Sequence, residues 1–371
     1  MVYNISNKWD PLEVCMLGNN YAPEFFNGIP DKAGDPLKRI CEETLEDLEG
    51  YKNILQQFGV DVIRPDMDTK ERFLDAPDRY PRGPLQPRDH QLVIANKCFT
   101  NKEKDHPNIQ KKLLEYDKNN TICTDKLLLP PHKYNEIACT VSGDWPIYED
   151  YANGCKLKTH VAKEIAELDF EPLCITSANS FQFDHRLVIG NTEGDGIADN
   201  CEGLVYYLKK YTNIDFELEL APMDGHIDGN YHPLKPGAII SLYDVQTYED
   251  TFPGWDICYL PDQGWQQIRG FQKLKNKNDG KWWLAGEEDN DEFIYFVETW
   301  LQDWVGYVEE TVFDVNVLML DQNHCCVSSS NNEIVNKFFK KHKIEPVHVP
   351  FRHRYFWDGG LHCITLDLKR G

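Results

Sequence analysis

The sequence predicts an α/β fold in which five strand–helix–strand units form a closed arrangement around an axis. Short apolar runs beginning beside Asp, Glu or Asn recur along the chain, a second run ending at or near proline follows each, and helical patterns separate most pairs. The alternative is an ordinary α/β protein whose strands merely look alike. The 371 residues would permit two or three domains at ~150 residues each, but no Pro/Gly/Ser-rich linker separates them. We therefore expect one domain spanning residues 1–371.

The strands are predicted from short apolar segments with polar boundaries. The first strands of the units are expected at residues 13–18, 89–96, 184–191, 237–242 and 316–321, and their partners at residues 60–65, 170–175, 216–222, 255–261 and 344–350. Two of the first strands are near copies, DHQLVIAN at 89–96 and DHRLVIGN at 184–191. This similarity is the strongest internal-repeat signal in the chain.

Helices are predicted from apolar stripes at helical spacing. The stripes are Leu37, Ile40, Leu45, Leu48, Ile54 and Leu55; Val161, Ile165 and Leu168; and Ile334, Val335, Phe338 and Phe339. Gly59 is a plausible C-cap of the first helix. The polar stretches at 101–112 and 273–292 are expected to be solvated loops or insertions.

Charge, hydropathy and cysteine content limit the classes of partner and compartment that fit the sequence. Lys and Arg number 39 against 61 Asp and Glu, so the formal charge of −22 argues against a nucleic-acid partner. The charge is compatible with a cationic small substrate, and the alternative is a surface charge that serves solubility alone. No apolar run approaches the ~18 residues of a spanning helix and the first ten residues do not resemble a signal peptide, so we expect no membrane partner and a cytoplasmic location. The 12 cysteines include no CxxC pair and are expected to be mostly reduced and buried.

The densest polar cluster, PMDGHIDGNYH at 222–232, follows a predicted strand. His226 and Asp228 are two residues apart, so in an extended segment their side chains point to the same side. One interpretation is a metal site made by His226, Asp228 and His232, for which no further ligand occurs at a recognisable spacing. Another is a general acid/base histidine beside a carboxylate that binds a cation. The third is a loop of solvated polar residues.

The C-terminal segment FWDGGLHCIT at 356–365 supplies a candidate nucleophile. Gly359 and Gly360 permit close approach of the backbone to a ligand, and Cys363 follows them. A cysteine attacks as its thiolate, which requires a nearby positive group at neutral pH. The alternative is a structural cysteine on a terminal strand.

Several motifs together resemble the amidinotransferase family, the arginine:glycine and arginine:inosamine-phosphate amidinotransferases of the pentein superfamily. The matching segments are HIDGNYHPLKPG at 226–237, NVLMLD at 316–321, DGGLHCITLDLKRG at 358–371, NKWDPLEVCMLG at 7–18 and QPRD at 86–89. They occur in the family's order over essentially the whole chain. The resemblance implies a five-bladed α/β propeller, the pentein fold, with pseudo-fivefold symmetry.

The resemblance also implies roles for individual residues. Cys363 is expected to be the nucleophile and His226 the general acid/base, with Asp89 and Asp228 holding the guanidinium group of the donor. Gly359 and Gly360 are expected to border the substrate. The implied reaction transfers the amidino group of arginine through an S-amidino-cysteine to an amine acceptor, without a metal or organic cofactor. Family members are often dimers, so a homodimer is possible.

The chain departs from the family at the position of the carboxylate that partners the catalytic histidine, where it has Asn179. An amide can hold the imidazole tautomer but lacks the charge that stabilises imidazolium. Asp184 is an alternative carboxylate. From the sequence we expect Asn179→Asp to keep or raise turnover.

A second departure concerns the substrates. Leu-Tyr-Asp-Val at 242–245 stands where glycine-type enzymes have an Arg for the substrate α-carboxylate. Arg352 and Arg354 are candidate replacements, and Glu309 and Glu310 could accept a second cationic group such as that of a diamine. Two alternatives to the transferase remain open: a pentein hydrolase of the arginine deiminase or dihydrolase type, and a weakly active or non-catalytic guanidino-binding homologue.

Overall fold

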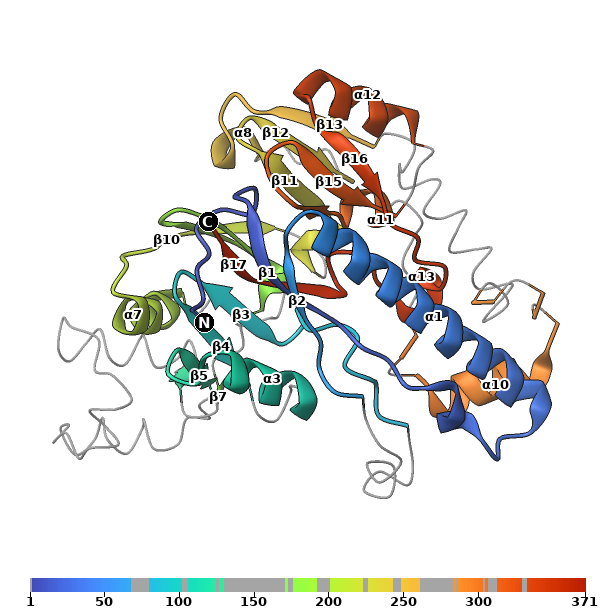
Figure 1. Cartoon of the computed structure of the whole chain (residues 1–371). Coiled ribbons are helices and arrows are strands. Elements are labelled where there is room, and N and C mark those ends of the chain that lie inside the picture. The colour runs from blue at the N-terminus through green and yellow to red at the C-terminus, as the bar shows by residue number, and fades with distance from the viewer. Residues whose placement is uncertain are drawn as a thin grey trace, which may run out of the picture.

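The computed structural model describes residues 2–67, 80–101, 106–124, 127–129, 171–172, 176–191, 201–222, 226–242, 248–260, 283–284, 286–287, 289–302, 304–305, 312–328 and 332–371. These residues form an α/β structure in which strands and helices alternate along the chain (Figure 1). Within them, no helix is both long and apolar enough to cross a membrane.

In the described part of the chain, five three-stranded sheets share one pattern, in which the middle strand runs antiparallel to one neighbour and parallel to the other. Written as antiparallel partner, middle strand and parallel partner, the sheets are β17 (Thr365–Arg370), β1 (Leu12–Leu17) and β2 (Asp61–Ile63); β3 (Gln91–Ile94), β4 (Lys97–Thr100) and β5 (Thr121–Cys123); β8 (Ser180–Phe183), β9 (Arg186–Asn191) and β10 (Glu217–Pro222); β11 (Tyr231–Lys235), β12 (Ala238–Ser241) and β13 (Asp256–Tyr259); and β14 (Leu318–Met319), β15 (His324–Val327) and β16 (Glu345–His348). A separate two-stranded sheet pairs β6 (Leu128–Leu129) with β7 (Glu171–Pro172).

Each parallel pair is joined through a helix, as a parallel connection requires. The five connecting helices are α1 (Asp31–Gln57), α3 (Pro107–Asp117), α7 (Cys201–Thr212), α8 (Tyr248–Thr251) and α12 (Glu333–His342). Outside this pattern lie α10 (Asp291–Trp300), α11 (Val312–Val315), α13 (Arg354–Trp357) and the 3-10 helices η1 (Pro23–Phe26), η3 (Ser177–Asn179) and η5 (Ile227–Gly229).

The first sheet joins the two ends of the chain. The C-terminal strand β17 pairs antiparallel with β1, with Cys15 opposite Asp367, and the two labelled termini lie near each other (Figure 1). The sheet therefore depends on residues from both ends of the sequence, and it fixes the segment that precedes β17.

Helix α1 follows from its apolar stripe and its C-cap. Leu37, Ile40, Leu48 and Leu55 are buried. The helix ends where Gly59 adopts a φ of 79°, and the amide groups of residues 59 and 60 donate to the carbonyls of residues 56 and 55. This is the hydrogen-bond pattern of a Schellman cap, so the C-cap predicted from the sequence is confirmed.

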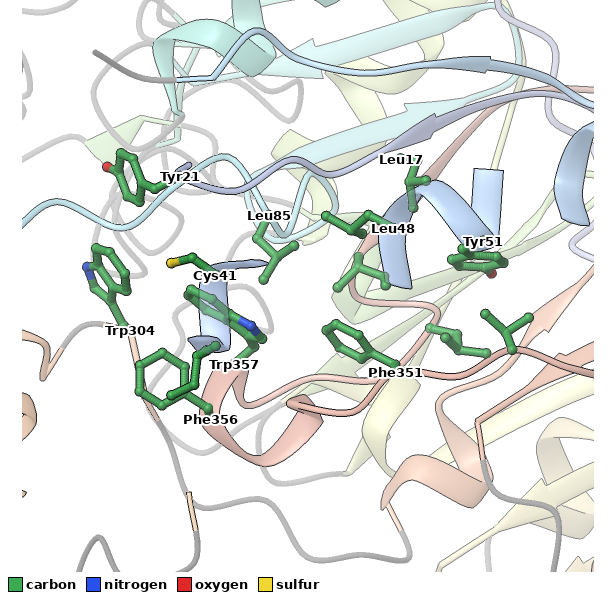
Figure 2. Packing of buried hydrophobic residues seen from close by; sticks show 14 of the residues in the cluster. Leu17, Tyr21, Cys41, Leu48, Tyr51, Leu85, Trp304, Phe351, Phe356 and Trp357 are labelled. Atoms are coloured by element: carbon green, nitrogen blue, oxygen red, sulfur yellow. The ribbon is translucent and has the colours of Figure 1, made fainter. Parts of the chain in front are cut away.

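The core beneath α1 also anchors the segment before β17. Trp357 of α13 stacks on Trp304 with ring centroids 5.6 Å apart, and its indole N–H donates to Thr44 Oγ1 at 2.8 Å. Figure 2 shows Trp357 together with Phe356, Cys41 and Leu85 in this cluster. Helix α10 packs beside α1 at the same end of the molecule (Figure 1).

The sequence-based strand assignments were wrong in detail at the hairpins. DHQLVIAN forms the edge strand β3, whereas DHRLVIGN contributes the middle strand β9, so the two near copies do not occupy equivalent positions. Asp184 and His185 form the turn between β8 and β9, with Asp184 at a φ of 50°, while Asp89 and His90 precede β3. Four of the units are therefore a hairpin, a helix and a strand, and in the fifth the antiparallel pair is formed by the two ends of the chain.

Two further expectations were wrong. The parallel partner of β4 is β5, not a strand at 170–175, of which residues 171 and 172 pair with β6 in the separate sheet. The polar stretch at 101–112 includes the start of α3. The stripe of Val161, Ile165 and Leu168 lies outside the described residues, as does most of the stretch at 273–292.

Candidate active site

The candidate nucleophile lies in the loop between α13 and β17. Asp358 ends α13 at a φ of 51°, and two glycines follow it. A Cβ atom on Gly359 would lie 2.5 Å from Gln86 Nε2, and one on Gly360 would lie 2.7 Å from Asn316 Oδ1. The glycines therefore allow the backbone to approach these two protein side chains closely, in the loop that leads to Cys363.

Cys363 is 8% exposed, and two side chains border its sulfur atom. Asn316 Nδ2 donates to Sγ at 3.0 Å, and Asp228 Oδ2 lies 4.0 Å from Sγ. Burial raises the pKa of the Cys363 thiol well above its usual value, and the carboxylates of Asp228 and Asp89 raise it further. In the unliganded site this sulfur is therefore a thiol at neutral pH.

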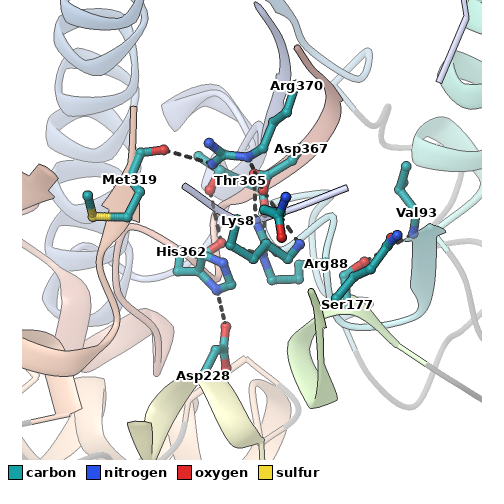
Figure 3. Close-up of polar contacts among 12 residues, drawn as sticks. Lys8, Arg88, Val93, Ser177, Asp228, Met319, His362, Thr365, Asp367 and Arg370 are labelled. Atoms are coloured by element: carbon teal, nitrogen blue, oxygen red, sulfur yellow. Dashed lines mark hydrogen bonds and ion pairs between the residues drawn. The ribbon is translucent and has the colours of Figure 1, made fainter. Parts of the chain in front are cut away.

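Asp228 is a buried carboxyl group held by the histidine that precedes the nucleophile. It lies in η5 with 0% exposure, and its Oδ2 is 2.6 Å from His362 Nδ1 (Figure 3). Burial raises the pKa of Asp228 to about 6, while His226 and Arg88 oppose that rise. Burial also holds the pKa of His362 well below its usual value, so neutral His362 donates its Nδ1–H to the Asp228 carboxylate.

Three buried oxygen atoms near this site have no hydrogen-bond partner among the described residues. They are Asp228 Oδ1, Asp89 Oδ1 and Gln86 Oε1. Gln86 uses its Nε2 to donate to the carbonyls of Trp357 and Asp358, at 3.0 and 3.3 Å. Because buried acceptors normally have partners, these atoms make the site suited to a ligand that carries several N–H donors.

Helix η3, which contains Asn179, packs against η5, the helix that follows His226. His226 is exposed and directly precedes η5, and its positive form lowers the pKa of Asp228. Asn179 Oδ1 accepts from the backbone N–H of Ile227 at 3.3 Å, and its Nδ2 donates to the Gly190 carbonyl at 2.9 Å. Both ends of the amide are thus used on backbone groups, and in the described part of the chain Asn179 holds the residue after His226 rather than its imidazole.

The structure excludes two of the substitutes considered from the sequence. Asp184 occupies the β8–β9 turn, at the far end of that hairpin from Asn179, where it accepts from Asn7 Nδ2. It therefore cannot support His226. Arg352 is committed elsewhere: its guanidinium binds Asp47, Glu46 and the Glu43 carbonyl at 2.7 to 2.9 Å. It cannot also bind a donor carboxylate.

The other candidate substitutes are Arg354, Glu309 and Glu310. Arg354 lies over the ring of Tyr355 at 5.3 Å. Glu309, Glu310 and residues 243–245 lie outside the described residues.

The proposed metal-ligand set does not come together as a centre. His232 is buried on β11 and its ring meets that of His362 edge to face at 4.9 Å. Burial lowers the pKa of His232 to about 3, and Arg88 contributes in the same direction. Among the described residues, no three His, Cys, Asp or Glu side chains gather in a group that could hold a metal ion.

A buried ion cluster holds the backbone of the cysteine loop, and Figure 3 shows its members Lys8, Arg88, Asp367 and Arg370 near His362 and Thr365. Arg88 Nε donates to the carbonyls of His362 and Thr365 at 2.9 and 2.8 Å, and its Nη2 pairs with Asp367 at 3.1 Å. Asp367 also pairs with Arg370 at 3.0 Å and with Lys8 at 3.5 Å. The two carbonyls bound by Arg88 flank Cys363, so this cluster positions the nucleophile.

Sequence reasoning missed Asn316, His362, Gln86 and Arg88 as contributors to the site. Each of them lies inside a segment that supports the family resemblance, namely NVLMLD, DGGLHCITLDLKRG or QPRD. That position in a matching motif was the available signal. The contacts that give these residues a role join separate segments of the chain and have no counterpart in local spacing.

Comparison with known proteins gives likenesses over nearly the whole chain. The chain is 23% identical over 397 residues to a mitochondrial glycine amidinotransferase of Gallus gallus, covering 98% of this chain and 82% of that protein. It is 22% identical over 372 residues to an L-arginine:L-lysine amidinotransferase of Pseudomonas savastanoi pv. phaseolicola, covering 97% and 86%. No family model matches the chain.

Solved structures share the fold. An amidinotransferase of Microseira wollei from the saxitoxin biosynthetic pathway superposes with a TM-score of 0.56 at 17% identity, covering 99% of this chain and 97% of that chain. The inosamine-phosphate amidinotransferase of Streptomyces griseus gives 0.53 at 16% identity with the same coverage. A dimethylarginine dimethylaminohydrolase gives 0.52 at 10% identity, covering 96% and 99%. With the motifs named above, these likenesses along nearly the entire chain show that the protein is similar to the amidinotransferases, and the named homologues support a transferase enzyme.

Proposed function

We propose that the protein transfers the amidino group of L-arginine, or of a related guanidino donor, to an amine acceptor through an S-amidino intermediate on Cys363. One observation carries this proposal: the Asp228 carboxyl group lies 4.0 Å from the Cys363 sulfur, the charge of Asp89 also acts on that sulfur, and each carboxyl group has a buried oxygen without a partner among the described residues. A guanidinium group presents planar N–H donors and a positive charge, and it satisfies both requirements.

The donor also explains how a buried thiol could become reactive. Asp228 and Asp89 raise the pKa of Cys363 in the empty site. A guanidinium bound between them adds a positive charge next to the sulfur and offsets the two carboxylates. The thiolate is then favoured only when the donor is present, and the carboxylates orient the amidino carbon towards it.

In the proposed reaction, Cys363 Sγ attacks the amidino carbon and the bond from that carbon to the side-chain nitrogen of the donor breaks. His226 gives a proton to the departing nitrogen, so that arginine leaves as ornithine. An acceptor amine then attacks the same carbon, His226 takes a proton from it, and the sulfur leaves as a thiolate. The product is a guanidino compound. The Cys363 thiol loses its proton to solvent when the donor binds and regains one when the product leaves, so the enzyme returns to its starting state.

The first experiment tests the covalent step. The enzyme is mixed with L-arginine in the absence of an amine, and intact-protein mass spectrometry is used to look for an amidino adduct, with Cys363→Ala as the control. We expect the adduct on the wild type alone, together with release of ornithine. Absence of both, with arginine and with other guanidino donors, would contradict the proposal.

The second experiment identifies the class of reaction. A panel of amines is added, and ornithine, citrulline and new guanidino products are quantified. Ornithine with a stoichiometric guanidino product supports the transferase. Citrulline formed without any amine would instead assign a hydrolase, in which water attacks the donor or the intermediate.

We also propose that the five three-stranded sheets are the blades of a closed five-bladed propeller with pseudo-fivefold symmetry. The identical strand pattern of the sheets supports this, and so does the pairing of β17 with β1, which joins the last part of the chain to the first. In such a ring the cysteine loop, η5 and the segment before β3 would all face the axis.

A further inference from the structure

Asn316 is a fully internal amide at the centre of the site. It precedes β14 and is 1% exposed. Its Oδ1 accepts from the backbone N–H groups of His362 and Cys363, both at 3.0 Å. Its Nδ2 donates to Cys363 Sγ at 3.0 Å and to the Asp228 carbonyl at 3.2 Å. One side chain therefore contacts the nucleophile, its backbone and the neighbouring carboxylate segment.

These contacts determine which way the amide points. Both partners of Oδ1 are N–H donors, which cannot accept a hydrogen bond. Rotating the amide by half a turn would place its NH₂ group against these two donors and its oxygen against the sulfur. The observed network therefore requires the NH₂ group to face Sγ.

The close packing of Asn316 against the cysteine loop depends on Gly360. A Cβ atom on residue 360 would lie 2.7 Å from Asn316 Oδ1 and 2.8 Å from its Cβ, distances that real Cβ atoms do not tolerate. Only glycine at this position lets the amide reach the sulfur. The loop and Asn316 are thus shaped for one another.

The hydrogen bond from Asn316 to Sγ opposes the groups that disfavour the thiolate. Burial and two carboxylates oppose the thiolate, while the Asn316 side chain and the backbone at Gly360 favour it. A thiol sulfur is a weak acceptor, whereas a hydrogen bond to a charged acceptor is roughly twice as strong as one between neutral groups. The bond from Asn316 is therefore worth more to the thiolate than to the thiol.

We propose that Asn316 is a catalytic residue, whose Nδ2–H donates to the Cys363 sulfur and stabilises its anionic form. The role rests on the proposed function, in which Cys363 is the nucleophile. It applies twice in that reaction: before the sulfur attacks the donor, and again when the sulfur leaves the amidino carbon.

The experiment measures the reactivity of the sulfur without any donor. Iodoacetamide is added over a range of pH, and alkylation is quantified on the peptide that contains Cys363, because Cys123 is an exposed thiol that also reacts. Asn316→Ser retains a small polar group that is too short to reach the sulfur. Asn316→Asp keeps the size and both backbone contacts but places an oxygen against the sulfur. Circular dichroism establishes that each variant is folded.

We expect the midpoint of the alkylation profile to rise by about one to two pH units in Asn316→Ser, the amount that loss of a hydrogen bond to a charged group implies. Asn316→Asp should raise it further, because a negative group then faces the thiolate. Transfer activity at neutral pH should fall in both variants.

Thr365→Val is the matched control for loop position. The Thr365 hydroxyl donates within the same loop, to the carbonyls of Leu361 and His362, without a contact to the sulfur. We expect its midpoint to equal that of the wild type. An unchanged midpoint in both folded Asn316 variants, or an equal rise in Thr365→Val, would overturn the proposal and leave Asn316 a structural residue.

The alkylation result is independent of the transferase assay. If the wild type forms no amidino adduct, the proposed function fails whatever the midpoints are. If the adduct forms and the midpoints do not move, only the role of Asn316 fails.

Discussion

Asp228 is a fully buried carboxyl group, and among the described residues only one of its oxygens has a partner. The other oxygen, Oδ1, is buried and unpaired in the described part of the chain, which costs folding free energy. Residues retained at such a cost commonly serve a ligand. The raised pKa of Asp228 makes this role dependent on pH.

We predict that binding of L-arginine weakens as the pH falls through about 6, the raised pKa of Asp228. Above this value the carboxylate is charged and attracts the guanidinium, and below it the neutral carboxyl group does not. Isothermal titration with Cys363→Ala removes the thiol from the measurement. Asp228→Asn should bind weakly at every pH, and a wild-type-like pH dependence in that variant would contradict the assignment.

The same residue links pH to stability in a defined direction. The pKa of Asp228 is higher in the folded protein, about 6, than its ordinary value of 3.8. Its protonation therefore favours the folded state, and its contribution to stability is lost as the pH rises through about 6. Partial burial alone would raise the pKa of Asp321, but its hydrogen bonds with His324 outweigh this effect and lower the pKa. Asp321 therefore stabilises the folded protein at neutral pH, and this contribution is lost as the pH falls through its lowered pKa.

Asn179→Asp is predicted to lower both stability and turnover, which reverses the expectation from the sequence. The Nδ2–H that donates to the Gly190 carbonyl would be replaced by an oxygen, and a buried charge would face that carbonyl. The expected cost is about 1–3 kcal/mol in the free energy of unfolding, measured by urea denaturation. Asn323→Asp, at an exposed position, is the control and should change it little. Turnover equal to or above that of the wild type would restore the original expectation.

Among the elements, the cysteine loop between α13 and β17 has no regular secondary structure, and its shape depends on two glycines. Gly360→Ala is predicted to push Asn316 away from the loop and to destabilise the protein by about 1–3 kcal/mol, with loss of transfer activity. Gly50→Ala is the matched control.

Gly50 lies on the exposed side of α1 and has open space at its Cβ position. A helical Gly-to-Ala change there should raise the free energy of unfolding by about 0.5–1 kcal/mol without an effect on activity. Equal behaviour of the two alanine variants would show that the tight contact at Gly360 has no importance.

The hairpins are the elements at which local patterns misled. In DHRLVIGN the first two residues form a tight turn, whereas the same two letters in DHQLVIAN precede an edge strand. The apolar pattern of a strand reports which of its faces are buried. It does not report whether the strand pairs with one neighbour or with two, so edge and middle strands have the same pattern. Helices α1 and α12 were predictable because their stripes are long and their ends carry caps.

At the scale of the whole molecule, a buried cluster of three cations and one anion joins both ends of the chain. Asp367 pairs with Lys8, Arg88 and Arg370, and these pairs hold its pKa well below the usual range despite its burial. Burial lowers the pKa of Lys8 to about 8, although Asp367 opposes the change. The cluster is stable only while its single anion is present.

Asp367→Asn is therefore predicted to be severely destabilising, by about 3–5 kcal/mol, because it leaves three buried cations without a counter-charge. Glu333→Gln is the control: its ion pair with Lys337 lies on the surface, with side chains 84% and 78% exposed, and should contribute at most about 0.5 kcal/mol. Chemical denaturation of both variants measures the difference. Comparable losses would mean that the buried cluster contributes no more than a surface pair.

The sequence by itself determined the resemblance to the amidinotransferases, the repeated α/β units, the long helix α1 and the residue types of the chemistry, because periodicity, caps and contiguous motifs are local properties. Only the tertiary structure decided which groups meet Cys363. Asn316 and Asp228 are 47 and 135 residues away along the chain, and Asn179 turned out to hold backbone instead of an imidazole. Hydrogen-bond partners at such separations are chosen when sheets and loops pack together, and no local pattern carries that information.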